Sequence, residues 1–318
     1  MSRTEKLQTV LVITAIFIGL ALGQISWFSE NAVHLIVPAL MVMLYGVFLN
    51  IPFNRLANAF QNYKVTGLSL GINFLWTPVF AWGLGAIFLR DTPDLWVGLI
   101  MLMVTPCTDW YLIFTSLAQG DVALATALLP WNLLLQVILL PVYLLIFTGS
   151  LIDIDAAILL ESVVLVLVVP MLLAFISKRL IKPQNRILHR LILKIAANQW
   201  LFLCVAIAAM FASQGEILIE QPELLLKMLL PVLIFFVINF WLGQIIGRLA
   251  HFSYEEVACF NCTTLARNSP IALAIATSTF GERPLIALAL VIGPLIELPV
   301  MVLVSQSLLR LRHQKGRF

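Results

Sequence analysis

The chain has 318 residues, of which 61% are hydrophobic and 11% are charged, with a net charge of +3 and a mean hydropathy of +1.02. A soluble domain has about 25% charged residues, so this chain has too little polar material to cover a water-exposed surface. The composition excludes a soluble enzyme, a disordered protein and a nucleic-acid binder. It predicts an all-α membrane protein, because helices satisfy their own backbone hydrogen bonds in lipid.

Ten apolar segments are long enough to cross the hydrocarbon core as helices, at about 20 residues each. The first is predicted to be a retained span rather than a cleaved signal peptide. The fourth and ninth are interrupted by polar residues. The ten segments lie at 7–26, 33–51, 67–89, 95–117, 122–147, 156–176, 193–213, 228–248, 255–280 and 284–309.

Most Lys and Arg residues fall in alternate loops, on the side that includes both termini. The opposite loops hold Arg90, Lys227 and Arg283. Because cytoplasmic loops carry the excess of basic residues, we expect a multi-pass protein of the cell (inner) membrane with both termini cytoplasmic. The basic loop at 177–194 is interpreted as an anchor of this topology.

The chain also contains a weak internal repeat around segments four and nine. Each copy has a Pro-containing polar interruption, a short apolar helix, a Gly-containing turn and a long span. Gly120 aligns with Gly281, and at the same offset Gln136 aligns with Glu297. Such repeats are typical of secondary transporters, in which the substrate binds where the interrupted helices meet.

Because each copy has an odd number of spans, the second copy starts on the opposite side of the membrane. Residues 1–150 and 151–318 are therefore predicted to form two inverted five-helix repeats, with helices four and nine broken and crossing.

The first interruption reads Thr105-Pro106-Cys107-Thr108-Asp109. Thr before Pro favours a helix cap and a first helical position, which predicts a half-helix that begins at Pro106. Cys107 then lies near a helix N-terminus, which favours a thiolate, and a soft thiolate suits a thiophilic solute. The alternative for Cys107 is a small packing residue. The carboxylate of Asp109 is costly at this depth, which indicates a function.

The second interruption reads Arg267-Asn268-Ser269-Pro270. Ser269 and Pro270 repeat the pattern of a cap followed by proline. A basic residue within a span needs a partner, and Asp109 is the candidate if the two interruptions cross. The pair would be either a structural ion pair or a site linked to substrate or protons.

Other polar residues lie within predicted spans. Glu297 is mid-span, where a carboxyl group is neutral much of the time, as a proton-coupling site requires. Asn132 and Gln136 either line the same cavity or hold helices together. Cys259 and Cys262 form a CxxC pair without the spacing of a zinc site, so they are interpreted as packing residues. No metal site and no cofactor are predicted.

At these residues the chain resembles the bile acid/sodium symporter superfamily, and most of all its arsenite-efflux permease branch. In segments four and five the resemblance lies in Pro106, Cys107, Thr108, Gly120 and Asn132. In segment ten it follows the pattern Gly-x-x-x-Glu-x-Pro-Val-Met, at Gly293, Glu297, Pro299, Val300 and Met301.

The resemblance implies a fold of five plus five helices with a mobile core domain, which carries the two crossed helices, and a supporting panel domain. In the arsenite branch the residue matching Cys107 binds arsenite, the residue matching Glu297 is essential, and proton exchange drives efflux. Asp109 departs from that branch, which usually has a small residue there.

The second interruption resembles a Gln-Asn-Ser stretch of the bile-acid branch, where that Gln and a Glu four residues earlier help to hold sodium. Those places are Arg267 and Thr263 in this chain. A guanidinium would repel sodium, so coupling to two sodium ions is not expected. Arg267 either serves as a built-in cation or attracts an anion.

The leading hypothesis is a secondary transporter, not an enzyme, that exports arsenite or a related metalloid in exchange for protons rather than sodium. It would work as a monomer or homodimer in the lipid bilayer, without nucleic acid. The expected substrate-binding residues are Cys107, Thr108, Asp109, Asn132, Arg267, Asn268 and Ser269, and the expected ion-coupling residues are Gln136 and Glu297. One alternative is a symporter that imports a small organic anion. Another is a membrane enzyme or sensor that uses the CxxC pair.

Overall fold

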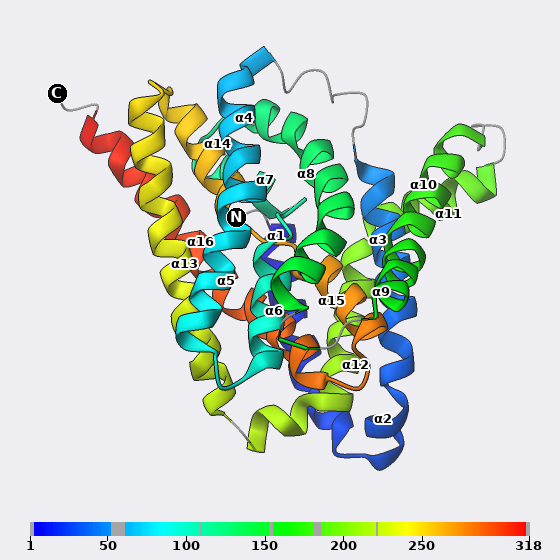
Figure 1. The fold of residues 1–318 in the computed structure, drawn as a ribbon. Coiled ribbons are helices and arrows are strands. Elements are labelled where there is room, and N and C mark those ends of the chain that lie inside the picture. Colours follow the sequence, from blue (N-terminus) through cyan, green and yellow to red (C-terminus); the bar gives the residue numbers. More distant parts are fainter. Residues whose placement is uncertain are drawn as a thin grey trace. The chain divides into compact units, whose positions relative to one another are not determined.

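The computed structural model describes residues 3–51, 61–108, 110–149, 151–152, 155–180, 186–220 and 222–315. Across these ranges the chain is built from helices, and no β-strand forms beyond one isolated bridge. Figure 1 shows the helices in sequence colours. The composition therefore predicted the all-α class correctly.

The chain divides into two compact units, and each unit draws on both halves of the sequence. The first unit comprises Met1–Ile51, Asp155–Leu225 and Pro270–Leu288. The second comprises Pro52–Ile154, Leu226–Ser269 and Ala289–Phe318.

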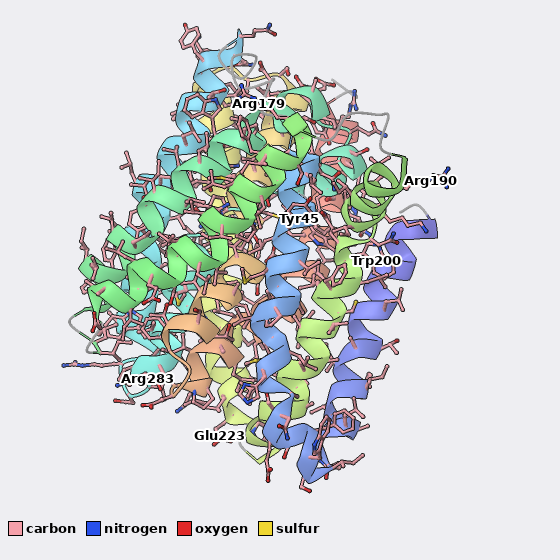
Figure 2. All side chains as sticks on the ribbon, turned by 90° about the vertical axis from the view of Figure 1, so that its right-hand side faces the viewer. Tyr45, Arg179, Arg190, Trp200, Glu223 and Arg283 are labelled. Atoms are coloured by element: carbon pink, nitrogen blue, oxygen red, sulfur yellow. The ribbon has the colours of Figure 1, made fainter. Side chains whose placement is uncertain are left out.

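In the first unit, helix α12 (Gln199–Glu220) packs against both α1 (Arg3–Gly23) and α3 (Val33–Asn50), and Figure 2 shows these three helices side by side. A Cβ atom on Gly19 would lie 2.5 Å from the backbone oxygen of Ala208, so α1 and α12 approach too closely there for any side chain. The Tyr45 hydroxyl donates to Ser177 Oγ at 2.8 Å and links α3 to α10. The helices of this unit are α1 (Arg3–Gly23), α2 (Ser26–Asn31), α3 (Val33–Asn50), α9 (Ala156–Val163), the π-helix η4 (Val164–Val168), α10 (Val169–Leu180), α11 (Arg186–Ala197) and α12 (Gln199–Glu220), with most of α15 (Ser269–Thr279).

The second unit carries both interruptions that the sequence predicted. One lies between α6 (Pro93–Met103) and α7 (Trp110–Leu117), and the other follows α14 (Tyr254–Leu265). The helices of this unit are α4 (Tyr63–Gly71), η2 (Ile72–Trp76), α5 (Thr77–Phe88), α6 (Pro93–Met103), α7 (Trp110–Leu117), α8 (Val122–Tyr143), η3 (Leu144–Thr148), α14 (Tyr254–Leu265) and most of α13 (Glu223–Leu249) and α16 (Pro284–Lys315).

Local capping sets where the site-bearing helices begin. Ser253 caps α14, and the Glu256 carboxylate accepts the backbone N–H of Ser253 at 2.7 Å, which completes a capping box. Asp121 caps α8 by accepting the backbone N–H of Leu124 at 2.9 Å. These caps fix the registers of α14 and α8, which carry several of the predicted site residues.

Six helical stretches are long and apolar enough to cross a membrane, among the described residues. They are Val33–Asn50, Tyr63–Phe88, Val122–Thr148, Ala156–Arg179, Glu223–Leu249 and Pro284–Arg312. Shorter apolar helices occupy Thr14–Gly23, Pro93–Met103, Gln199–Ser213 and Ser269–Thr279. The protein is thus a multi-pass membrane protein, while ten crossings in two inverted repeats stay a prediction.

One predicted boundary is wrong. The basic stretch expected as a loop at 177–194 contains the separate helix α11, and the segment expected to start at 193 is replaced by α12, which begins at Gln199. The basic residues of α11 recur every three to four positions among Leu and Ile. That spacing gives an amphipathic helix rather than a loop.

Candidate functional site

The two interruptions meet backbone to backbone. Pro106 and Arg267 form an antiparallel bridge. On either side of it, the Cys107 N–H donates to the Ala266 oxygen at 3.0 Å and the Asn268 N–H donates to the Thr105 oxygen at 2.6 Å. Each interruption thus satisfies backbone groups that the other leaves without a helical partner.

Side chains strengthen this junction. The Asn268 amide donates to the Thr108 hydroxyl at 2.9 Å. The Thr105 hydroxyl lies 3.0 Å from the Met101 carbonyl and 3.2 Å from the Asn268 carbonyl. Thr105 therefore binds the end of α6 to the second interruption.

The predicted half-helix that starts at Pro106 is wrong. Pro106 pairs with Arg267 in the bridge, Cys107 lies outside any helix, and α7 begins at Trp110. Pairing with the second interruption holds the first in an extended conformation, so Cys107 does not lie in the first turn of a helix. The helix α15 begins at Ser269, one residue before the expected start at Pro270, and the Ser269 hydroxyl donates to the Leu290 carbonyl instead of capping the helix.

Arg267 is buried, with 4% of its surface exposed, and its side chain is held by oxygen atoms. Nε donates to the Leu265 carbonyl at 3.1 Å, Nη1 to the Met103 carbonyl at 2.7 Å, and Nη2 to Asn73 Oδ1 at 3.0 Å and to the Thr264 carbonyl. These carbonyls end α6 and α14, where helix C-termini concentrate negative charge.

Glu297 joins the same junction from α16. Its Oε1 accepts the backbone N–H of Arg267 at 2.8 Å, and its side chain is 5% exposed. The carbonyl of that same peptide group, on Ala266, accepts the N–H of Cys107. One peptide group thus lies between the Cys107 backbone and the Glu297 carboxylate.

Cys107 is itself buried, with 3% of its surface exposed. Arg267 interacts electrostatically with both Cys107 and Glu297. The junction therefore brings a thiol, a guanidinium and a carboxyl group within range of one another, in surroundings from which water is largely excluded.

Asn132 and Gln136 lie on α8 with no exposed surface. Asn73 Nδ2 donates weakly to Asn132 Oδ1, at 3.4 Å, which connects Asn132 to Arg267 through a single residue. Among the described residues, the Asn132 Nδ2 atom and both amide atoms of Gln136 have no hydrogen-bond partner. Buried polar atoms are rarely left so, and such groups need a ligand or water.

The structure brings most of the predicted residues together. Cys107, Thr108, Arg267, Asn268 and Glu297 meet at the junction, Ser269 borders it, and Asn132 is one residue removed. No hydrogen bond links Gln136 to the junction within the described part of the chain. Asp109 lies outside the described residues, so its pairing with Arg267 stays a prediction.

Sequence reasoning missed Asn73, which contacts Arg267, Asn132 and the Thr263 carbonyl (3.3 Å). It lies in the π-helix η2, and such irregular turns are frequent at functional sites. A signal was present, because Ser69, Asn73 and Thr77 recur every four residues within an apolar segment and share one helix face.

Comparison with known proteins gives consistent results. The model of the Sodium Bile acid symporter family matches residues 37–221. The arsenical-resistance protein Acr3 of Corynebacterium glutamicum is 26% identical over 277 residues, which cover 83% of this chain and 75% of that protein. Acr3 of Alkaliphilus metalliredigens is 24% identical, covering 97% of this chain and 93% of that protein. An uncharacterized transporter of Synechocystis sp. is 26% identical, covering 95% of this chain and 87% of that protein.

Proposed function

Because the chain belongs to the Sodium Bile acid symporter family, a family of transporters, we propose that this membrane protein exports arsenite or a related metalloid in exchange for protons. The observation that carries the proposal is the peptide group that joins Cys107 to Glu297 at the junction of the two interruptions. Two similar proteins are named for arsenical resistance, which supports the choice of substrate.

Cys107 is the proposed ligand for the metalloid. Thiolates are soft ligands and prefer soft, thiophilic centres. The nearby charge of Arg267 supplies the electropositive surroundings in which a cysteine acts as a ligand. Thr108, the next residue along the chain, and Asn268, which donates to it at 2.9 Å, are the proposed polar groups for the oxygens of the solute.

Glu297 is the proposed proton carrier. Carboxyl groups inside membrane-spanning segments are costly, and in transporters they mark proton relays. Its hydrogen bond to the Arg267 N–H uses an oxygen as acceptor, and both the neutral and the ionised carboxyl group have such an oxygen. Glu297 can therefore exchange a proton while it stays attached to the second interruption.

The remaining proposals concern topology. We expect ten spans in two inverted repeats, both termini in the cytoplasm and the inner membrane as the location. The two inverted repeats are supported by the division into units, since each unit takes helices from both halves of the chain.

Import of a small organic anion is the alternative function, with Arg267 as the anion-binding group. The hydrogen bonds of Arg267 favour metalloid export instead, since Nε, Nη1 and Nη2 all donate to protein oxygens. An anion site would need some of these donors to face the solute.

The test is arsenite uptake into inside-out membrane vesicles that are energised to be acidic inside. Uptake by the full-length protein should stop when the proton gradient is collapsed. The Cys107→Ala variant should lose uptake, whereas Cys204→Ala, which removes a half-buried cysteine of α12, should keep it.

Wild-type uptake by Cys107→Ala would remove the thiol from the mechanism. Sulfonate or carboxylate transport that survives Cys107→Ala and disappears with Arg267→Ala would favour the organic-anion function. Redox-dependent activity that persists when both interruptions are mutated would point to the CxxC pair instead.

A further inference from the structure

Two helix C-termini converge on the guanidinium of Arg267. Met103, the last residue of α6, accepts at 2.7 Å, and Leu265, the last residue of α14, accepts at 3.1 Å. The Thr264 carbonyl and Asn73 Oδ1 (3.0 Å) complete the set. These four oxygen atoms form an oxygen shell around the guanidinium.

The oxygen shell has the composition of a site for a small cation. Carbonyls in the last turn of a helix lack an intrahelical donor and carry the negative end of the helix dipole. In membrane transporters, half-helix C-termini and unwound carbonyls coordinate the coupling ions. In channels, carbonyl oxygens replace the water around an alkali ion.

All four acceptors of the oxygen shell belong to neutral groups, and their oxygen atoms carry partial negative charges. The positive charge of Arg267 balances these partial charges. The face of the Phe235 ring adds a further attraction, with its centroid 5.1 Å from the guanidinium carbon. The partial charges of the oxygen atoms and the face of the aromatic ring therefore both attract this one cation.

We propose that Arg267 is a tethered cation that fills the position of an alkali ion, and that it makes the transporter independent of sodium. The consequence for transport rests on the function proposed above, whereas the occupancy of the oxygen shell can be measured by ion binding alone. Removal of the guanidinium leaves the shell available to a sodium ion.

The experiment compares thermal unfolding of the purified full-length protein in sodium chloride and in choline chloride at equal ionic strength. A ligand that binds only the folded state raises its stability with concentration. Wild type and Arg267→Lys, which keeps a tethered charge, should unfold at the same temperature in both salts. Arg267→Ala should be stabilised by sodium, to a saturating limit.

Two further variants sharpen the comparison. Arg267→Met keeps an apolar chain against Phe235 and should also gain stability from sodium, even if Arg267→Ala folds poorly. Arg312→Ala removes an arginine whose Nη2 lies 3.0 Å from Glu255 Oε1, outside the oxygen shell, and should show no sodium effect. In vesicles, transport by Arg267→Ala should require sodium.

Equal stability of Arg267→Ala and Arg267→Met in the two salts would overturn the proposal. Failure of both variants to fold in sodium would do so as well, because sodium is expected to replace the lost charge. Sodium stabilisation of the wild type would also overturn it. If the variants bind sodium but the wild type does not move arsenite, the proposed substrate is wrong and the tethered cation stands.

Discussion

Cys107 and Glu297 lie on opposite sides of a single peptide group. The Ala266 carbonyl accepts the Cys107 N–H at 3.0 Å, and the Arg267 N–H, in the same peptide unit, donates to Glu297 Oε1 at 2.8 Å. The C=O and N–H of a trans peptide point in opposite directions. The two residues therefore act on each other through a rigid group that belongs to the second interruption.

If Glu297 carries the proposed proton and Cys107 binds the proposed solute, this link offers a route between them. Hydrogen bonds in series polarise one another, so an ionised Glu297 strengthens the bond between Cys107 and Ala266. Protonation of Glu297 weakens that bond and loosens the extended backbone at Cys107. The bridge between Pro106 and Arg267 holds the two interruptions side by side, so a change at one is felt at the other.

The first prediction concerns Glu297→Gln. Glutamine keeps an oxygen acceptor for the Arg267 N–H but cannot carry a proton, so the variant should fold and bind arsenite. Exchange of arsenite for arsenite across vesicles should persist, and uptake driven by a proton gradient should fall at least about tenfold, as expected when a coupling proton is lost.

The control is Glu161→Gln, which changes an exposed glutamate of α9 and should leave both assays unchanged. Proton-driven uptake at the wild-type rate by Glu297→Gln would exclude Glu297 as the carrier. Loss of arsenite exchange as well would place Glu297 in substrate binding rather than in coupling.

The sequence was sufficient to locate both interruptions and to predict that they meet. Proline removes a backbone donor, and a buried arginine requires acceptors, so both residues mark places where a helix is broken. The expected partner of Arg267 was a carboxylate. Among the described residues, the ends of α6 and α14 accept from the guanidinium, because their last carbonyls also lack donors; pairing with Asp109 stays a prediction.

The errors come from contacts between residues far apart in the chain. Local rules place a cap at Thr105 and a helix start at Pro106, but pairing with Arg267 holds that backbone extended. Asn73 and Arg267, for example, are 194 positions apart in the sequence. Spacing within one segment identifies a polar face, but only the fold shows which residue that face meets.

The second prediction concerns Asn73→Leu. The substitution removes the acceptor at 3.0 Å from Arg267 Nη2 and the donor to Asn132, and it leaves a buried charged group with one bond fewer. The expected cost is about 1–3 kcal/mol in the free energy of unfolding, measured by thermal denaturation in detergent.

Asn31→Leu is the matched control, since the Asn31 amide donates to the nearby Trp27 carbonyl at 2.8 Å and the residue is exposed. It should change stability by less than about 0.5 kcal/mol. Equal stability of Asn73→Leu and wild type would show that Asn73 does not support the guanidinium.

The third prediction concerns Gly120→Ala. A Cβ atom at Gly120 would lie 2.9 Å from the Cβ of Ala258 and 3.0 Å from the backbone nitrogen of Cys259, in α14. Backbone cannot move aside as a flexible side chain does, so α14 must shift and the junction at its far end must follow. We expect a loss of about 1–3 kcal/mol together with reduced arsenite uptake.

The comparison is Gly67→Ala in α4, where nothing lies within 4 Å of the added Cβ atom. That variant should gain up to about 1 kcal/mol, because alanine favours a helix over glycine. A loss of stability at Gly67, or none at Gly120, would contradict the expected close approach of α14.

The last prediction concerns the ion pair between Arg312 and Glu255, which joins the end of α16 to the start of α14. Arg312 Nη2 lies 3.0 Å from Glu255 Oε1, and the side chains are 39% and 45% exposed. Arg312 Nη1 also donates to Gln119 Oε1 at 2.7 Å, so the group connects three helix ends. Water and salt screen such a pair, so its coupling energy in a double-mutant cycle of Arg312→Ala and Glu255→Gln should be about 0.2–1 kcal/mol. It should shrink further in about 1 M salt, where the screening length falls to roughly 3 Å. A coupling of several kcal/mol would mean that this end of α14, rather than the buried junction at Arg267, determines how the two helices are held.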